Sequence, residues 1–140
     1  MEPGSEAVED EEIVYRRVPA PHWAGPEGQA TPQAFIPHKT ADQDGLSLER
    51  AKYSSPERVA ARKPDRPSYV VALRVRDLRE AGLDVTPDPD MEHDNPGHCL
   101  IRGLRSEVRG SEETRELADL LAHRLSRLVF VYHPPESNPR

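Results

Sequence analysis

One proline-free stretch, SYVVALRVRDLREAGLDVT at residues 68–86, sets the pattern of the fold. Proline removes a backbone donor and fixes φ, so the interiors of strands and helices exclude it. Residues 69–75 are a near-continuous apolar run, which predicts a strand buried on both faces. Residues 76–81 predict a helix of one to two turns, followed by Gly82 where a left-handed cap is required. Residues 83–86 then predict a short strand.

A second proline-free stretch covers residues 97–133. It predicts strands at 98–104 and 128–132 and, between them, the main helix of the chain at 111–126. Ser111 is placed to cap this helix, and acids fill its first turn. One apolar stripe at helical spacing runs along the helix, made of Leu117, Leu120, Leu121 and Leu125.

Prolines interrupt the N-terminal half more often. A β-branched and aromatic run predicts a first strand at 13–18, and residues 19–45 predict a long Pro-rich loop. The segment 46–53 is of uncertain type. A cap followed by proline marks the start of a short helix at 57–62. The apolar anchors of the loop are Trp23, Phe35 and Ile36.

These elements predict an α+β domain, in which a small mixed β-sheet of four to five strands is covered by one main helix and flanked by short helices. At 140 residues we expect one domain, and we place it at 13–133. Residues 1–12 hold six of the 25 acidic residues and no base, so they predict a disordered acidic tail. Residues 134–140 predict a disordered C-terminal tail.

The net charge of −6 belongs to the N-terminal tail, because the rest of the chain carries 19 acids and 19 bases. A neutral body has no global field for nucleic acid or for anionic membranes, so we expect neither as a partner. We expect the tail to be able to dock on the basic surface of a protein partner. One local basic run is mixed with acids and lacks an aromatic platform, which favours a solvated face. Its members are Arg58, Arg62, Lys63 and Arg66.

The chain has a single cysteine, Cys99, which excludes a disulfide within the chain and fits a reducing cytosol. No apolar run approaches the length of a membrane span, and the acidic N-terminus is unlike a signal peptide. We therefore expect a cytoplasmic protein. The sequence contains neither a Walker A loop nor a dinucleotide-binding glycine motif, and we expect no cofactor.

The polar stretch PDPDMEHDNPGHC, residues 87–99, holds the densest set of reactive side chains. Its Pro, Asp and Asn residues are typical of turns, which favours a solvated loop that enters a strand at His98. Histidine is also a metal ligand, and His93 and His98 are the candidates for a metal site, although no known metal spacing is matched. On a strand, Cys99 points away from His98 and shares a face with Ile101. We therefore predict a buried cysteine and take His98 as the candidate catalytic residue.

Three further residues are candidates for binding a ligand. Arg16 and Arg17 are adjacent on the first strand, so one of them points to each face. A surface strand with solvated arginines is the favoured interpretation, and the alternative is an arginine that lines a cleft, where a guanidinium suits phosphate or carboxylate. Ser47 most simply caps a helix. No nucleophile-elbow motif surrounds it, which argues against a hydrolase serine. Ser47 is also a candidate for lining a cleft together with the arginines.

Four short motifs carry a resemblance to other proteins. They are Val-Tyr-Arg-Arg-Val-Pro at 14–19, Ala-Phe at 34–35, Leu-Ser-Leu at 46–48 and Asn-Pro-Gly-His at 95–98. Together they resemble small bacterial hypothetical proteins of similar length, over residues 13–104. That group has no established activity, so the resemblance implies a bacterial, stand-alone domain and assigns no catalytic or binding residue.

The sequence leaves three functions open. The first is a small non-enzymatic accessory or protein-interaction module, favoured by the low apolar content of 35%, the missing catalytic motif and the acidic tail. The alternative is a small enzyme or a nucleotide- or phosphate-binding domain, with the Pro-rich loop as a lid. Its cleft would be lined by Arg16 or Arg17, Ser47 and His98. A metal-dependent protein that uses the two histidines of the polar stretch is the third hypothesis.

Overall fold

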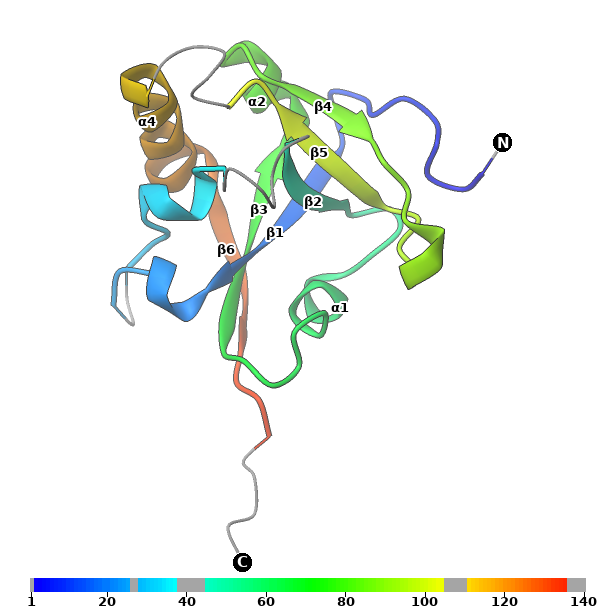
Figure 1. Ribbon diagram of the computed structural model, residues 1–140, viewed down its shortest axis with the longest axis horizontal. Helices are drawn as coiled ribbons and strands as arrows, with labels where there is room; N and C mark the ends of the chain where they lie inside the picture. The colour runs from blue at the N-terminus through cyan, green and yellow to red at the C-terminus, as the bar shows by residue number, and fades with distance from the viewer. Residues whose placement is uncertain (1, 26–27, 38–44, 105–110, 136–140) are drawn as a thin grey trace, which may run out of the picture.

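The computed structural model describes residues 2–25, 28–37, 45–104 and 111–135. Within these residues, six strands form one sheet, and helices lie on both of its sides (Figure 1). The strands are β1 (Ile13–Pro19), β2 (Leu46–Arg50), β3 (Ser68–Arg74), β4 (Asp84–Pro87), β5 (His98–Arg102) and β6 (Arg127–Tyr132). The helices are α1 (Pro56–Ala60), α2 (Val75–Glu80) and α4 (Ser111–Leu120), which continues into the π-helical turn η4 (Leu121–Leu125). The 3-10 turns are η1 (Ala20–His22), η2 (Pro32–Phe35) and η3 (Met91–His93).

The strand order is β4-β5-β2-β1-β3-β6, and every described neighbouring pair is antiparallel. The α+β class agrees with the prediction, but the sheet is antiparallel where a mixed one was expected, and it has more strands. Parallel neighbours need a crossover of about a dozen residues or more, and α2 is too short to provide one. The additional strand is β2. Its Ser47 does not cap a helix but pairs with Leu100 of β5.

The sheet separates two apolar clusters. The larger contains residues of α2, α4, η2 and η4, among them Phe35 and Leu121, together with inward side chains of five strands. The smaller lies under α1, where Val59 and Ala60 pack on Val70 of β3. β3 contributes to both clusters, so it is buried on both faces, as its near-continuous apolar run predicted.

Two local signals predicted from the sequence are present. Ser55 caps α1, because its side chain accepts a hydrogen bond from the Arg58 N–H at 3.2 Å. Gly82 follows α2 with a φ of +88°, the left-handed conformation expected there. The N–H of Leu83 then donates to the Leu78 carbonyl at 3.0 Å, and both leucine side chains are buried. This pair of features ends α2 and starts β4.

The main helix also forms at its expected position, and parts of the predicted Pro-rich loop lie within the described residues. The loop is anchored by Trp23, which stacks on Tyr69 with ring centroids 4.4 Å apart, and by Phe35, which is fully buried. The predicted disordered tail at 134–140 lies for the most part outside the described residues. Among the described helices, none combines the length and the apolar character that a membrane span requires.

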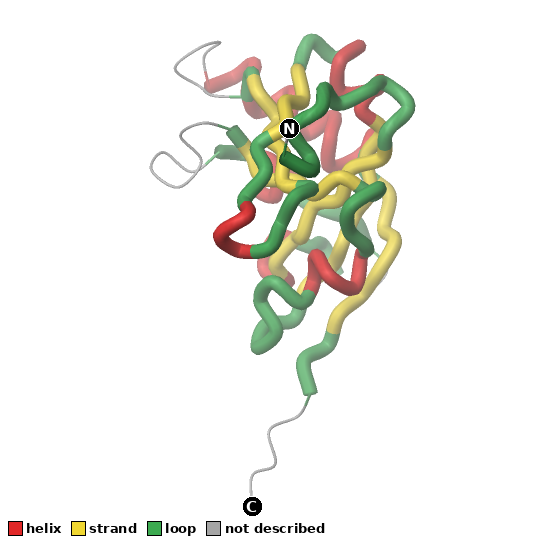
Figure 2. Tube along the Cα trace, turned by 90° about the vertical axis from the view of Figure 1, so that its right-hand side faces the viewer, coloured by secondary structure: helices red, strands yellow, loops and turns green. Residues whose placement is uncertain are grey.

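Residues 2–12 pack against the domain, whereas the sequence predicted a disordered tail. Figure 2 views the molecule from the side on which this segment lies. Val8 is buried in the larger cluster. Gly4 is buried as well, and a Cβ added to it would collide with the carbonyl oxygen of Pro96. The segment is therefore part of the folded body.

Arg50, at the end of β2, accounts for this difference. Its side chain is fully buried, and Nε and Nη2 donate to the Glu12 carboxylate at 2.8 and 2.7 Å. The three remaining N–H groups donate to the main-chain oxygens of Gly4, Glu6 and Ala7. A buried guanidinium is tolerated only when it is paired, so Arg50 fixes the segment on the domain. Composition could not show this, because the partners lie far apart in the sequence.

Candidate functional site

A cleft of about 530 Å³ opens on the side of the sheet that α1 covers. Its walls come from β1, β2 and β5, from the end of α1 and from the connection that contains η3. The residues suggested by the sequence for ligand binding or catalysis all line it, namely Arg16, Arg17, Ser47 and His98. The other lining residues are Tyr15, Leu48, Glu49, Val59, Arg62, Lys63, Asp90, His93 and Asn95.

Strand register brings these side chains together. β2 lies between β1 and β5, with Tyr15 opposite Glu49 and Glu49 opposite His98. Alternate residues of a strand share a face, so Arg17 lies on the same side of the sheet as Tyr15, and Ser47 on the same side as Glu49. The intervening apolar residues of the three strands face the larger cluster. The cleft floor is therefore the polar face of the sheet.

Ser47, His98 and Asp88 form a hydrogen-bonded chain beside the cleft. The Ser47 Oγ lies 3.0 Å from the His98 Nε2. On the other side of the ring, Nδ1 lies 2.9 Å from the main-chain oxygen of Asp88 and 3.2 Å from its Oδ2. Both oxygens are acceptors only, so we assign the proton of the neutral ring to Nδ1. Nε2 is then an acceptor, and the Ser47 hydroxyl donates to it.

The guanidinium of Arg16 holds main-chain atoms in place. Its Nε donates to the Ala34 carbonyl at 2.7 Å, and its Nη1 donates to the Ser47 carbonyl at 2.8 Å. The group also lies 5.8 Å from the centroid of the Phe35 ring, within the range of a cation–π contact. Arg16 thus ties the Pro-rich loop to β2 beside Ser47, which is a positioning role.

Arg17 lies on the opposite face from Arg16, and its surroundings differ. Its Nε and Nη2 atoms are covered and form no hydrogen bond within the described residues. Burial lowers the pKa of Arg17, the charge of Arg66 lowers it further, and Asp65 partly offsets both. Covered N–H groups without an acceptor cost free energy, so an anion that reaches Arg17 would supply the hydrogen-bond acceptors that the fold does not.

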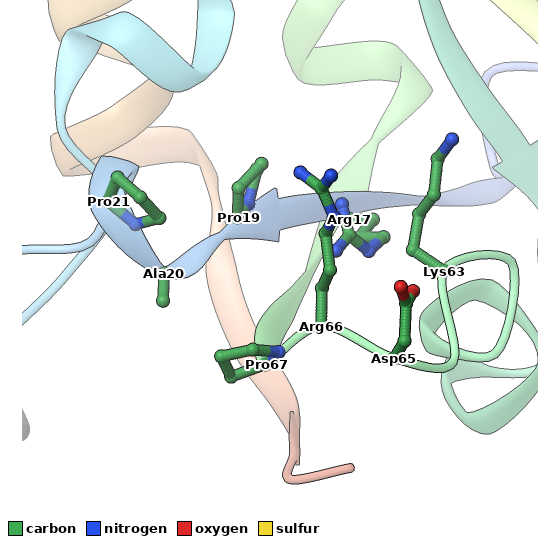
Figure 3. A pocket seen from close by; sticks show the side chains of 8 residues that line it. All are labelled: Arg17, Pro19, Ala20, Pro21, Lys63, Asp65, Arg66 and Pro67. Carbon is green, nitrogen blue, oxygen red and sulfur yellow. The ribbon is translucent and has the colours of Figure 1, made fainter.

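Arg17 is also part of the wall of a second cavity, of about 630 Å³. Figure 3 shows the Arg66 side chain extending from the loop after α1 toward Arg17, with Lys63 on the same side. Of the described residues that line this cavity, three are basic and one, Asp65, is acidic, which leaves an excess of two positive charges. The two cavities thus share a cationic wall.

The buried acid of the first cleft is already neutralised. Glu49 accepts hydrogen bonds from the Arg62 guanidinium at 2.9 and 3.1 Å and from the Ser54 hydroxyl at 2.8 Å. Its side chain is only 8% exposed. The positive excess therefore belongs to the cations of the second cavity.

The two histidines proposed for a metal site are not brought onto one ligand position. Both ring nitrogens of His98 are occupied by the hydrogen-bonded chain described above, and the His93 Nδ1 lies 2.9 Å from the Asp90 Oδ2. In the described part of the chain, the ligand atoms of Asp90, Glu92 and His93 lie within 4.8 Å of one another around η3. This cluster is largely exposed, and exposed acids are common without an ion, so it carries no metal assignment.

Cys99 is fully buried, as the strand alternation predicted. Burial raises the pKa of its thiol to about 12. The thiolate is the nucleophilic form of cysteine, so this side chain is inert at neutral pH. The reactive groups of the cleft are Ser47 and His98.

Asp88 and the cations at 62–66 were missed by sequence reasoning. Asp88 was interpreted as a turn residue, but its main-chain N–H donates to the His98 carbonyl at 2.9 Å across the β4–β5 pair, which sets its side chain beside the ring. Asn95 was also assigned to a turn, and its covered Oδ1 has no hydrogen-bond partner within the described residues. The basic run was interpreted as a solvated face. The position of these cations directly after α1, which packs on β1, the strand of Arg17, is the signal that could have indicated their role.

No protein-family model, curated protein or solved structure matches the chain.

Proposed function

We propose that the protein binds a small phosphate-bearing ligand at Arg17, on the cationic wall that the cleft on the α1 side of the sheet shares with the second cavity. The observation that carries this proposal is half-buried Arg17, whose Nε and Nη2 atoms are covered without hydrogen-bond partners within the described residues and whose side chain borders both cavities. A phosphate oxygen beside it would restore the hydrogen bonds that the group loses on burial.

Charge favours phosphate over carboxylate as the bound group. Lys63 and Arg66 line the same wall as Arg17, and Asp65 balances only one of the three cations. An excess of two positive charges matches the charge of a phosphate monoester at neutral pH. A planar guanidinium also offers parallel N–H donors to two phosphate oxygens at once.

The sequence also favoured a protein-interaction module whose acidic tail docks on a basic partner. Four acids of that tail instead form ion pairs with basic residues of the same chain. These pairs are Glu6 with Lys52, Asp10 with Arg79, Glu11 with Arg76 and Glu12 with Arg50. Carboxylates that are paired inside the fold are less available to a partner, so the tail supports that function less than its composition suggested.

Calorimetric titration with inorganic pyrophosphate at constant ionic strength tests phosphate binding. Constant ionic strength matters because exposed charges are screened by salt. We expect saturable binding that Arg17→Met weakens by about tenfold or more, equivalent to about 1.4 kcal/mol. The variant should stay folded, because it removes a half-buried guanidinium whose Nε and Nη2 form no hydrogen bond within the described residues.

The matched control is Arg58→Met. Arg58 belongs to the same basic run and is exposed, but it lines neither cavity. Pyrophosphate affinity should be unchanged in this variant. Absence of saturable binding to the unmodified protein, or equal affinity in the Arg17→Met variant, would rule out the proposal.

A second candidate function, interaction with another protein chain, is favoured by β6. β6 is the last strand in the sheet order, so its outer edge has no strand partner among the described residues. Its side chains Leu128, Val129 and Val131 are 40–41% exposed. An apolar edge strand is a template for pairing with a further strand, and a second copy of this chain would offer the same edge.

Light scattering over a range of protein concentrations tests this second function. A dimer that Val129→Glu converts to a monomer supports pairing through β6. A mass that stays monomeric at every concentration excludes it.

A further inference from the structure

We propose that Ser47 is a nucleophile activated by His98, and that the cleft hydrolyses carboxylic esters of phosphate-bearing compounds. The phosphate-bearing part of the substrate rests on the proposed function. The nucleophile does not, because it is carried by a different set of contacts.

The first of these contacts is the hydrogen-bonded chain from Ser47 through His98 to Asp88. An acceptor nitrogen 3.0 Å from a serine hydroxyl is placed to take its proton. The opposite nitrogen is held by two oxygens of Asp88, which fixes the ring orientation and the tautomer. A chain of serine, histidine and acid is recognised by this geometry and by the roles of its members, and it recurs on unrelated folds.

The second observation is that the serine is presented from a rigid element. Ser47 is exposed to the cleft, while Leu46 and Leu48 on either side are buried. β2 is paired on both sides, with Ser47 opposite Leu100, and the Arg16 guanidinium holds the Ser47 carbonyl. A nucleophile on a paired strand keeps its position better than one on a loop.

The chemistry needs no group beyond water and the substrate. The Ser47 Oγ attacks the ester carbonyl carbon while its proton passes to the His98 Nε2. The bond from that carbon to the leaving oxygen breaks, and the leaving oxygen takes the proton from Nε2, which releases an alcohol and leaves an acyl ester on Ser47. Water then adds to the acyl carbon and gives a proton to Nε2, and the Ser47 Oγ recovers that proton as the carboxylic acid leaves.

The surroundings support these steps through Asp88. The Asp88 carboxylate faces the ring nitrogen that stays protonated, so it stabilises the imidazolium formed in each step, and Asp88 is a positioning residue. The cations that line the cleft are Arg16, Arg17, Arg62 and Lys63. Other charged groups facing this site are Glu49, which is paired with Arg62, and Asp90, which is paired with His93.

Labelling with a small uncharged fluorophosphonate, followed by peptide mass spectrometry, tests the nucleophile. The expected adduct is on Ser47, and Ser47→Ala should abolish it. His98→Gln should slow labelling by about a hundredfold or more, because the general base is lost. The matched control is Ser5→Ala, because Ser5 lies in the N-terminal segment and does not line the cleft. This variant should be labelled on Ser47 at the unmodified rate.

A second test is the tautomer of His98, because a purely structural role would not require a particular tautomer. Nitrogen-15 shifts of the ring should show a protonated Nδ1 in the neutral form. Asp88→Asn should slow labelling less than His98→Gln does, since the Asp88 main-chain oxygen still holds Nδ1, and it should change the Nδ1 shift. No adduct on Ser47, a rate indifferent to His98→Gln, or a neutral ring protonated on Nε2 would each overturn the proposal.

The two proposals fail separately. The probe carries no phosphate monoester, so the labelling of Ser47 and the binding of pyrophosphate are measured independently on the unmodified protein. Labelling with no pyrophosphate binding would overturn the proposed ligand and keep the nucleophile. Pyrophosphate binding without labelling would do the reverse.

Discussion

Arg50→Met is expected to destabilise the protein strongly. The guanidinium is fully buried and uses all five N–H donors, two of them on a Glu12 side chain that is only 12% exposed. Methionine fills a similar volume but removes the charge, so the Glu12 carboxylate is left covered without its cation. Breaking a buried pair in this way costs about 3–5 kcal/mol. A domain of this size is stable by about 5–15 kcal/mol, so the loss is a large fraction of the total.

Urea denaturation measures this loss as a shift of the unfolding midpoint. Arg76→Met is the matched control, because Arg76 also pairs with an acid of the N-terminal segment, Glu11, but with both side chains about half exposed or more. An exposed pair contributes about 0–1 kcal/mol. If Arg50→Met lowers the free energy of unfolding by less than about 1 kcal/mol, or by no more than Arg76→Met does, the segment is not held as described.

Further predictions concern pH, thiol reactivity and packing. The Lys52 ammonium holds the pKa of Glu6 at about 2, below its ordinary value. The stability from this contact should therefore be complete above pH ~4.5 and fall as the pH drops toward 2. Urea midpoints measured across this range should show the fall, and the Glu6→Gln variant should show a flatter pH dependence. Because burial raises the pKa of the Cys99 thiol to about 12, a disulfide reagent at pH ~8 should react with it only after unfolding, and rapid reaction of the native protein would contradict its burial. In Gly97→Ala the new Cβ would lie 2.8 Å from the Tyr53 Cβ, so we expect a loss of about 1–3 kcal/mol in thermal or urea unfolding, and an unchanged midpoint would refute this packing.

Local rules explain which parts of the fold the sequence could predict. The cap at Ser55, the left-handed Gly82 and the doubly buried β3 each depend on a few neighbouring residues. The alternation of side chains along a strand was enough to predict that Cys99 is in the core and that His98 lies on the opposite face, where it lines the cleft. These predictions needed no knowledge of distant contacts.

Long-range pairing explains what the sequence could not predict. β2 contains serine, glutamate and arginine, which give it little strand propensity, and it is a strand because β1 and β5 pair with it on both sides. The acidic segment was assigned to disorder because its composition was considered without Arg50, which lies 38 residues beyond Glu12. The candidate residues of the cleft were named, but their assembly with Asp88 depends on the register of β4 and β5.

The most direct test of the central claim, an anion site at Arg17, is a titration with pyrophosphate followed through the arginine Nε–H signals in nitrogen-15 NMR. The Arg17 Nε has no hydrogen-bond partner within the described residues, whereas the Arg50 Nε is bound to Glu12 and serves as an internal reference. We expect a saturable shift of the Arg17 signal and no shift of the Arg50 signal. An Arg17 signal that does not move, or that moves equally with chloride at the same ionic strength, would contradict this claim.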